Sequence, residues 1–141
     1  MIKGFTCGAF DLCHAGHFLM FKEAKKHCTY LIVGLQIDPS VTVKEYRGKN
    51  KNKPIMSLEE RKIILEGIRY IDKIVVYKTE EDLYKLLKKI KPDIRIIGAD
   101  WKGKKFTGWD LPIKIYFNSR NHKYSTTELR DRLKKVNKII F

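Results

Sequence analysis

Short apolar runs alternate along this chain with apolar residues at helical spacing. The runs that predict strands cover residues 2–7, 31–35, 74–77, 94–97 and 113–117. Apolar residues three and four positions apart predict helices that include residues 18–24, 57–68, 83–90 and 129–136. Five strands alternating with four helices indicate a single α/β domain over residues 1–141, with a Rossmann-like open, mostly parallel five-stranded sheet and helices on both faces.

The order of these elements also indicates where a ligand would bind. In open parallel sheets, ligands bind beyond the carboxyl ends of the strands, near the point where the strand order reverses. Two helices are expected to begin with a capping box, Ser57 with Glu60 and Ser125 with Glu128. Because Ser125 follows the last strand on the ligand side, the free N–H groups of its helix could also bind a phosphate.

Charge narrows the class of partner. The 141 residues carry 30 Lys+Arg against 16 Asp+Glu, which gives a net charge of +14. Such a field attracts nucleic acid, an acidic membrane surface or polyphosphate metabolites, although many lysines could simply be solvated surface. Aromatic residues are not interleaved with the basic runs, which argues against a nucleic-acid-binding domain.

Other sequence features indicate a cytoplasmic protein. No apolar run approaches the roughly 18 residues needed to span a bilayer, and the first residues lack the pattern of a signal peptide. The three cysteines, Cys7, Cys13 and Cys28, are too few for a disulfide framework and are expected to be free, buried thiols.

The loop after the first strand carries the strongest chemical signal. His14 and His17 stand three residues apart at the expected start of a helix, where N–H groups and the helix dipole favour an anion. Gly16 between them would let a phosphate approach the backbone. Two alternatives stay open: ordinary helix-start histidines, and a zinc site with Cys7 and Cys13, for which the spacing is poor.

The chain resembles the H-x-G-H nucleotidyltransferases, and among them the glycerol-3-phosphate cytidylyltransferases. The first signature is Gly8-x-Phe10-Asp11-x-x-His14-x-Gly16-His17. The second is Arg120 followed five residues later by Ser125-Thr126-Thr127, and its usual form is R-T-x-G-I-S-T-T. Between them, in family order, come Glu60-Arg61-Lys62, Arg69-Tyr70-Ile71-Asp72 and Gly98-Ala99-Asp100-Trp101-Lys102-Gly103-Lys104.

This resemblance implies transfer of CMP from CTP, with Mg²⁺ arriving on the triphosphate, to a small phosphorylated alcohol, first of all glycerol 3-phosphate. The implied catalytic residues are His14, His17, Lys44 and Arg120. The implied nucleotide-binding residues are Gly8, Ala9, Phe10, Asp11, His14, Gly16, His17, Asp100, Trp101, Arg120, Tyr124, Ser125, Thr126 and Thr127. An adenylyltransferase, or a cytidylyltransferase for another phospho-alcohol or a sugar phosphate, is the alternative.

The acceptor side and the assembly are less defined. Lys44, Arg61 and Lys78 are the expected acceptor-binding residues. Lys44 lies in the basic segment 44–54, which is either a solvated loop or a lid. Arg69 and Asp72 are expected to form a structural ion pair.

A homodimer is expected from the family resemblance and from the apolar end, residues 139–141.

Overall fold

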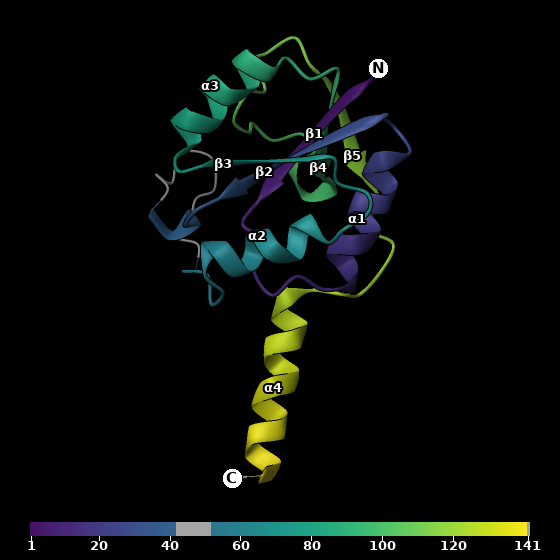
Figure 1. Ribbon diagram of the computed structural model, residues 1–141. Coiled ribbons are helices and arrows are strands. Elements are labelled where there is room, and N and C mark those ends of the chain that lie inside the picture. The colour runs from purple at the N-terminus through teal and green to yellow at the C-terminus, as the bar shows by residue number, and fades with distance from the viewer. Residues whose placement is uncertain (42–51, 141) are drawn as a thin grey trace.

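The computed structural model describes residues 1–41 and 52–140 and shows a single five-stranded parallel sheet (Figure 1). The strand order is β3-β2-β1-β4-β5, and every neighbouring pair is parallel. The strands are β1 (Lys3–Gly8), β2 (Tyr30–Gln36), β3 (Lys73–Tyr77), β4 (Ile94–Gly98) and β5 (Lys114–Asn118). The Rossmann-like prediction is therefore confirmed, and β5 lies at one edge of the sheet.

Helices cover both faces of this sheet. The α-helices in the described ranges are α1 (Ala15–Lys25), α2 (Leu58–Glu66), α3 (Glu80–Ile90) and α4 (Thr126–Ile140). Phe21 and Ala24 of α1 and Leu65 of α2 pack in one buried cluster, whereas Leu83 and Leu87 of α3 pack in the other. Because β2 is covered on both sides, its run of apolar residues is buried without a polar face.

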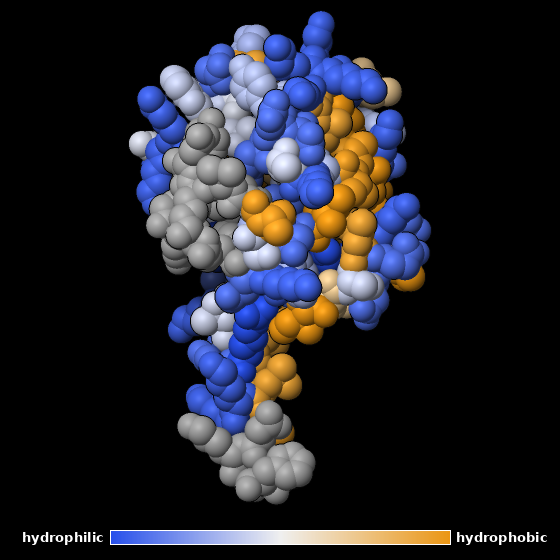
Figure 2. All heavy atoms as spheres, turned by 90° about the vertical axis from the view of Figure 1, so that its left-hand side faces the viewer, coloured by the Kyte–Doolittle hydropathy of each residue, from blue (hydrophilic) through white to orange (hydrophobic). Residues whose placement is uncertain are grey.

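The fourth helix leaves the body of the domain. Figure 1 shows α4 projecting from it as a stalk, and Figure 2 shows that one side of this stalk is hydrophobic and the other hydrophilic. Leu133 and Val136 on the apolar side are 60% and 47% exposed. In the described ranges no helix combines the length and the hydropathy needed to cross a bilayer.

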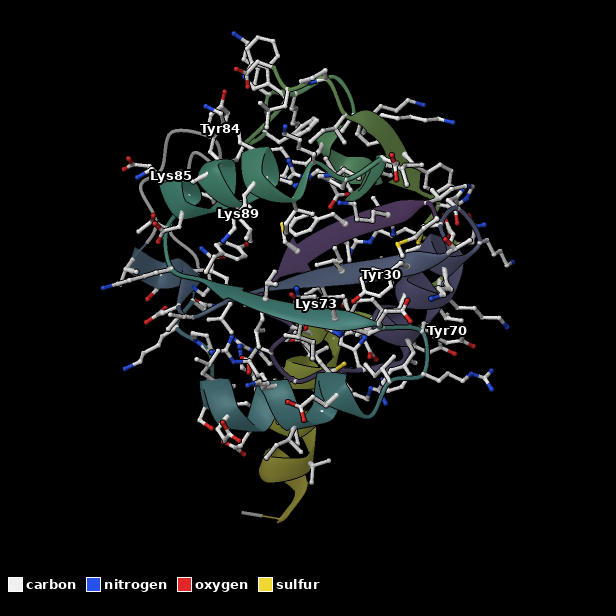
Figure 3. All side chains as sticks on the ribbon, turned by 45° about the horizontal axis from the view of Figure 1, so that its top comes forward. Tyr30, Tyr70, Lys73, Tyr84, Lys85 and Lys89 are labelled. Carbon is white, nitrogen blue, oxygen red and sulfur yellow. The ribbon has the colours of Figure 1, made fainter. Side chains whose placement is uncertain are left out.

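Surface lysines account for part of the positive charge. Lys73 on β3 and Lys85 and Lys89 on α3 are all exposed (Figure 3). These cations lie away from the carboxyl ends of β1 and β4, so they act as solvated surface charge.

The two central strands separate before they end. β1 pairs with β4 only at Gly4–Ile94 and Phe5–Arg95. In contrast, β1 stays paired with β2 as far as Gly8, and β4 with β5 as far as Gly98. The sheet therefore opens between β1 and β4, at the point where the strand order reverses and where a ligand is expected.

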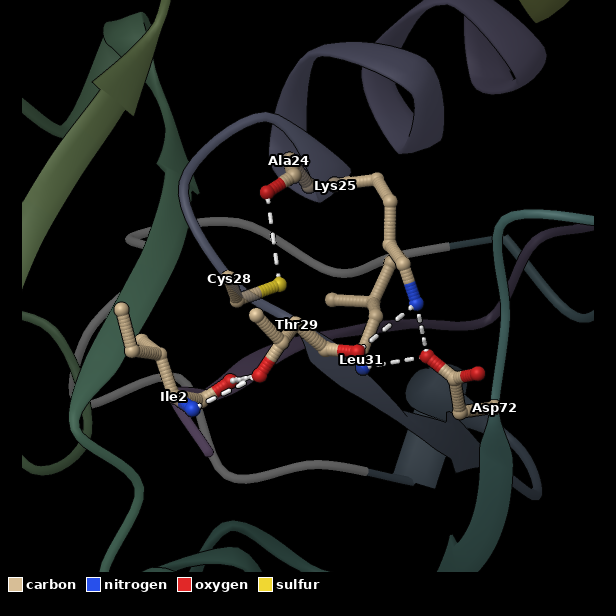
Figure 4. Close-up of polar contacts among 7 residues, drawn as sticks. All are labelled: Ile2, Ala24, Lys25, Cys28, Thr29, Leu31 and Asp72. Carbon is tan, nitrogen blue, oxygen red and sulfur yellow. Dashed lines mark hydrogen bonds and ion pairs between the residues drawn. The ribbon is translucent and has the colours of Figure 1, made fainter.

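One predicted ion pair is wrong. Asp72 does not pair with Arg69: its Oδ2 accepts the Leu31 N–H at 2.8 Å and pairs with the ammonium group of Lys25 (Figure 4). The Arg69 guanidinium instead donates to the Tyr70 hydroxyl. Asp72 precedes β3 and reaches the neighbouring strand β2, so the carboxylate fixes the start of both strands.

Arg61 has a structural position that its sequence context did not indicate. The residue is only 2% exposed, although a contact with the acceptor substrate was expected from the family resemblance. Its Nη1 donates to the carbonyls of Ala9 and Gln36 at 3.0 and 2.7 Å, and its Nη2 to that of Ile37 at 2.6 Å. The guanidinium therefore ties α2 to the loops that follow β1 and β2, and the structure does not present it to a substrate.

Replacing this anchor tests its structural role. Arg61→Met keeps much of the apolar stem but leaves buried carbonyl oxygens without donors, so we expect the free energy of unfolding to fall by about 3 kcal/mol or more. Urea unfolding measures this free energy. Arg69→Met, at an exposed position, is the control and should change the free energy of unfolding by less than about 0.5 kcal/mol. Unchanged stability in Arg61→Met, with activity alone lost, would instead support acceptor binding.

Candidate functional site

A cavity of about 430 Å³ opens where β1 and β4 separate. Thr6 and Cys7 of β1 and Ile97 and Gly98 of β4 form part of its wall. The start of α1 and the segment from Arg120 to the start of α4 close it from the other side. The cavity therefore lies at the carboxyl ends of the strands, where ligands of such sheets bind.

His14 and His17 fold into a reciprocal cap at the start of α1. The Nδ1 atom of His14 accepts the Gly16 N–H at 3.0 Å, and the Nδ1 atom of His17 accepts the His14 N–H at 3.1 Å. The two ring centroids are 4.0 Å apart. Because both Nδ1 atoms accept hydrogen bonds, each neutral ring carries its proton on Nε2, and both rings line the cavity.

Burial keeps these rings uncharged. It lowers the pKa of His17 to about 4, with a further lowering by His14 and an opposing effect of Asp11. The pKa of His14 is also lowered, first by burial and then by His122 and Arg120. Near pH 7 the two imidazoles are therefore neutral N–H donors, suited to phosphate oxygens without the cost of burying cations.

Two imidazole rings occupy the space beside Gly16. A Cβ atom at this position would lie 2.8 Å from Cε1 of His14 and 2.9 Å from Cε1 of His122. Any larger residue would push these imidazoles apart. The glycine thus keeps the rings close together at the helix start.

Arg120 lies at the rim of the cavity in a strained backbone conformation. Its φ angle is +52°, in the left-handed region that non-glycine residues rarely adopt. Its Nη1 pairs with Oδ2 of Asp100 at 2.6 Å, and the Asp100 side chain is 67% exposed. The ion pair holds the guanidinium beside the opening, where an anion could compete for it.

The helix start beyond Arg120 adds hydroxyl and N–H donors. Ser125 caps α4 by accepting the Glu128 N–H at 3.1 Å. The Glu128 carboxylate binds Arg132, one turn further along. Ser125, Thr126 and Thr127 line the cavity together, so a helix N-terminus faces it.

The structure brings together most, but not all, of the expected site residues. Those that line the cavity are His14, Gly16, His17, Trp101, Arg120, Tyr124, Ser125, Thr126 and Thr127. Five other expected residues are not part of its wall: Gly8, Ala9, Phe10, Asp11 and Asp100. Lys78 is exposed at the end of β3 and lies outside the wall. Lys44 falls outside the residues that the structure describes.

Phe10 and Asp11 support the loop between β1 and α1 instead of lining the cavity. The Phe10 ring is buried against His17 and Phe21, with ring centroids 5.6 and 5.1 Å apart. Asp11 accepts the N–H groups of Ile55 and Met56 at 2.8 and 2.9 Å. The conformation of the loop that carries His14 is therefore held from both sides.

Several cavity residues were not anticipated from the sequence. His122 lies beside the paired imidazoles, and Asn118 is 5% exposed in the wall. Deeper in, the Arg95 guanidinium donates to the Thr107 carbonyl, and the Thr107 hydroxyl donates to Glu80 at 2.7 Å. Arg95 could have been found from the sequence, because it is a charged residue inside the apolar run of β4. No feature of the sequence marked Asn118 as a cavity residue.

The cysteines do not complete a metal site in the described ranges. There, no three His, Cys, Asp or Glu side chains group closely enough to hold a metal ion. Cys7 and Cys13 are half-buried and Cys28 is buried, and all three are free thiols. Burial raises the pKa of Cys13 to about 11, so this thiol stays protonated near neutral pH.

Comparison with known proteins identifies a family profile and relatives that are longer than this chain. The cytidylyltransferase-like profile matches residues 5–132. The bifunctional protein HldE of Campylobacter concisus is 36% identical over 130 residues, which are 92% of this chain and 26% of that protein. HldE of Wolinella succinogenes is 42% identical over 107 residues, 76% of this chain and 22% of that protein. The chain thus spans about a quarter of the length of these relatives.

Solved structures share the fold. A lipopolysaccharide core biosynthesis protein from Thermoplasma volcanium superposes with a TM-score of 0.58 at 24% identity, over 97% of this chain and 89% of that one. A candidate nicotinate-nucleotide adenylyltransferase from Vibrio parahaemolyticus gives a TM-score of 0.60 at 16% identity, over 96% and 88% of the two chains. At these identities the likeness establishes the fold alone.

The lowered pKa of His17 predicts a pH dependence of stability. Between the ordinary pKa of 6.5 and about 4, the unfolded chain binds a proton that the folded chain does not. The free energy of unfolding should therefore fall as the pH falls through this window, by at most about 3 kcal/mol from this group. His17→Asn keeps an acceptor for the His14 N–H but does not titrate, so its urea-unfolding midpoint should depend less on pH. Identical slopes for the two proteins would contradict the assignment.

Proposed function

This chain belongs to the cytidylyltransferase-like family and is a nucleotidyltransferase, and from that premise we propose that it transfers CMP from CTP to a small phosphorylated alcohol. Glycerol 3-phosphate is the first candidate acceptor, and a sugar phosphate the second. The observation that carries the proposal is the convergence of His14, His17, Arg120 and the start of α4 on one cavity. These groups are N–H and O–H donors, which is what a triphosphate requires.

The reaction needs positioned donors more than it needs a base. An alcohol phosphate is largely ionised near pH 7, because its second pKa is about 6, so its oxygen can attack the α-phosphorus directly. A new P–O bond forms, the bond from the α-phosphorus to the bridging oxygen of the β-phosphate breaks, and pyrophosphate leaves with that electron pair. Charge accumulates on phosphate oxygens during this step, so fixed donors lower the barrier.

The geometry suggests a role for each donor. The Nε2–H groups of His14 and His17 would bind phosphate oxygens as charge shifts toward the leaving group. Arg120, together with the hydroxyl and N–H groups of Ser125 and Thr126, would hold the β- and γ-phosphates at the helix N-terminus. Mg²⁺ would enter as part of the substrate, on the triphosphate, whose oxygens are the ligands it prefers.

CTP and ATP differ in the base that the cavity must recognise, and both are therefore compared as nucleotide donors. Trp101 lines the cavity with Asp100 beside it, which is where the cytosine or ribose would lie. ATP is the second candidate, because Asp100 could accept from a ribose hydroxyl, which both nucleotides share. We further propose a homodimer, supported by the exposed apolar side of α4 at Leu133 and Val136.

Pyrophosphate release tests the function directly. The protein with Mg²⁺ is assayed with CTP, ATP, GTP and UTP, each against glycerol 3-phosphate, phosphoethanolamine and a panel of sugar 1-phosphates. We expect turnover with CTP that requires a phosphorylated acceptor. Turnover with ATP alone would replace the cytidylyl assignment, and tight, salt-sensitive binding of oligonucleotides without pyrophosphate release would overturn the enzymatic one.

Variants of the paired imidazoles test the mechanism. His14→Ala and His17→Ala should each lower kcat by about two to four orders of magnitude, because each removes a donor to the reacting phosphates. His27→Ala is the matched control, since this ring packs on Tyr116 with centroids 3.8 Å apart and does not line the cavity. A wild-type rate in either of the first two variants, with circular dichroism unchanged in all three, would refute the role.

A further inference from the structure

A third imidazole lines the same cavity from another segment of the chain. His122 lies between β5 and α4, is half-buried, and lines the cavity with His14 and His17. Its Cε1 atom lies against Gly16, where an added Cβ would be only 2.9 Å away. The ring is also close enough to both other imidazoles to lower their pKa values.

The backbone fixes the tautomer of this ring as it does for the other two. The Nδ1 atom of His122 accepts the Tyr124 N–H at 3.1 Å, and the two rings stack with centroids 5.4 Å apart. The proton of the neutral ring is therefore on Nε2, which leaves an N–H donor without a backbone role. All three imidazoles of the cavity thus have the same tautomer.

The position of His122 along the chain indicates which part of a ligand it meets. Arg120 precedes it by two residues, and Ser125, the cap of α4, follows three residues later. Both neighbours line the same cavity and belong to the group that would hold the β- and γ-phosphates. A donor between them is best placed for the portion of the triphosphate that leaves.

We propose that His122 is a third phosphate-binding imidazole, whose Nε2–H donates to the pyrophosphate portion of the bound nucleoside triphosphate and of the released product. The proposal rests on the nucleotidyl transfer proposed above. It gives the leaving group a donor from the β5–α4 segment, while His14 and His17 act from α1. The pyrophosphate would then be held between two elements that approach each other at Gly16.

Two substitutions separate this role from a purely structural one. In His122→Asn, the side-chain oxygen can still accept the Tyr124 N–H two residues on, so the turn is kept while the distant donor is lost. In His122→Gln, the longer side chain places an amide N–H donor near the position of Nε2, while the local acceptor is altered. If His122 has a purely structural role, His122→Asn should bind pyrophosphate like the wild type. If its Nε2–H is a donor, His122→Gln should bind pyrophosphate like the wild type and His122→Asn should bind it more weakly.

Binding of inorganic pyrophosphate with Mg²⁺, measured by calorimetry, distinguishes the two roles. We expect His122→Asn to weaken binding about tenfold to a hundredfold, because a hydrogen bond to a charged group is lost, and His122→Gln to stay within about threefold of the wild type. His27→Gln, outside the cavity, should bind like the wild type. The ratio kcat/KM for the triphosphate should follow the same order, and thermal unfolding checks that all variants are folded.

The outcomes also separate this inference from the function beneath it. If the wild type releases pyrophosphate from a triphosphate and binds it, but His122→Asn binds it equally well, the role of His122 is refuted and the function stands. If His122→Gln binds pyrophosphate as weakly as His122→Asn does, a donor near the position of Nε2 does not restore binding, and the donor role is again refuted. If the wild type neither releases nor binds pyrophosphate, both proposals fail.

Discussion

The separation of β1 from β4 is the constraint on which the site depends. The two strands pair only at Gly4–Ile94 and Phe5–Arg95, so the sheet is open at its centre just where the strand order reverses. The chain leaving β1 must then turn into α1 with its first N–H groups unpaired by the sheet. Imidazole Nδ1 atoms bind two of these groups, those of His14 and Gly16. The histidine cap therefore binds N–H groups that the open sheet leaves unpaired.

This use of Nδ1 determines the chemistry that the cavity can offer. A ring that accepts a backbone hydrogen bond through Nδ1 presents an N–H at Nε2, and burial keeps His17 from becoming a cation near pH 7. Neutral donors can surround a polyanion without repelling one another when it is absent. Positive charge comes instead from Arg120 at the rim, where solvent and Asp100 balance it.

Local pattern predicted the fold well and the site only in part. Strands, helices and the two-histidine loop follow from periodicity and short motifs, which act over a few residues. Arg61 was misjudged because a cation near a helix start looks the same in sequence whether it faces solvent or three buried carbonyls. Asp72 was given the wrong partner because Lys25, at the end of α1, is distant in sequence and becomes adjacent only in the folded domain. His122 was overlooked because only the fold brings it to Gly16.

The protonation of the three cavity imidazoles tests this account most directly. Long-range ¹H–¹⁵N correlation spectra at pH 7 distinguish a neutral ring protonated on Nε2 from one protonated on Nδ1 and from the doubly protonated cation. The account predicts that His14 and His17 show the neutral Nε2–H form, and that the Nε2 resonances of all three rings shift when a nucleoside triphosphate with Mg²⁺ is added. Rings protonated on Nδ1, or resonances unmoved by the triphosphate, would contradict it.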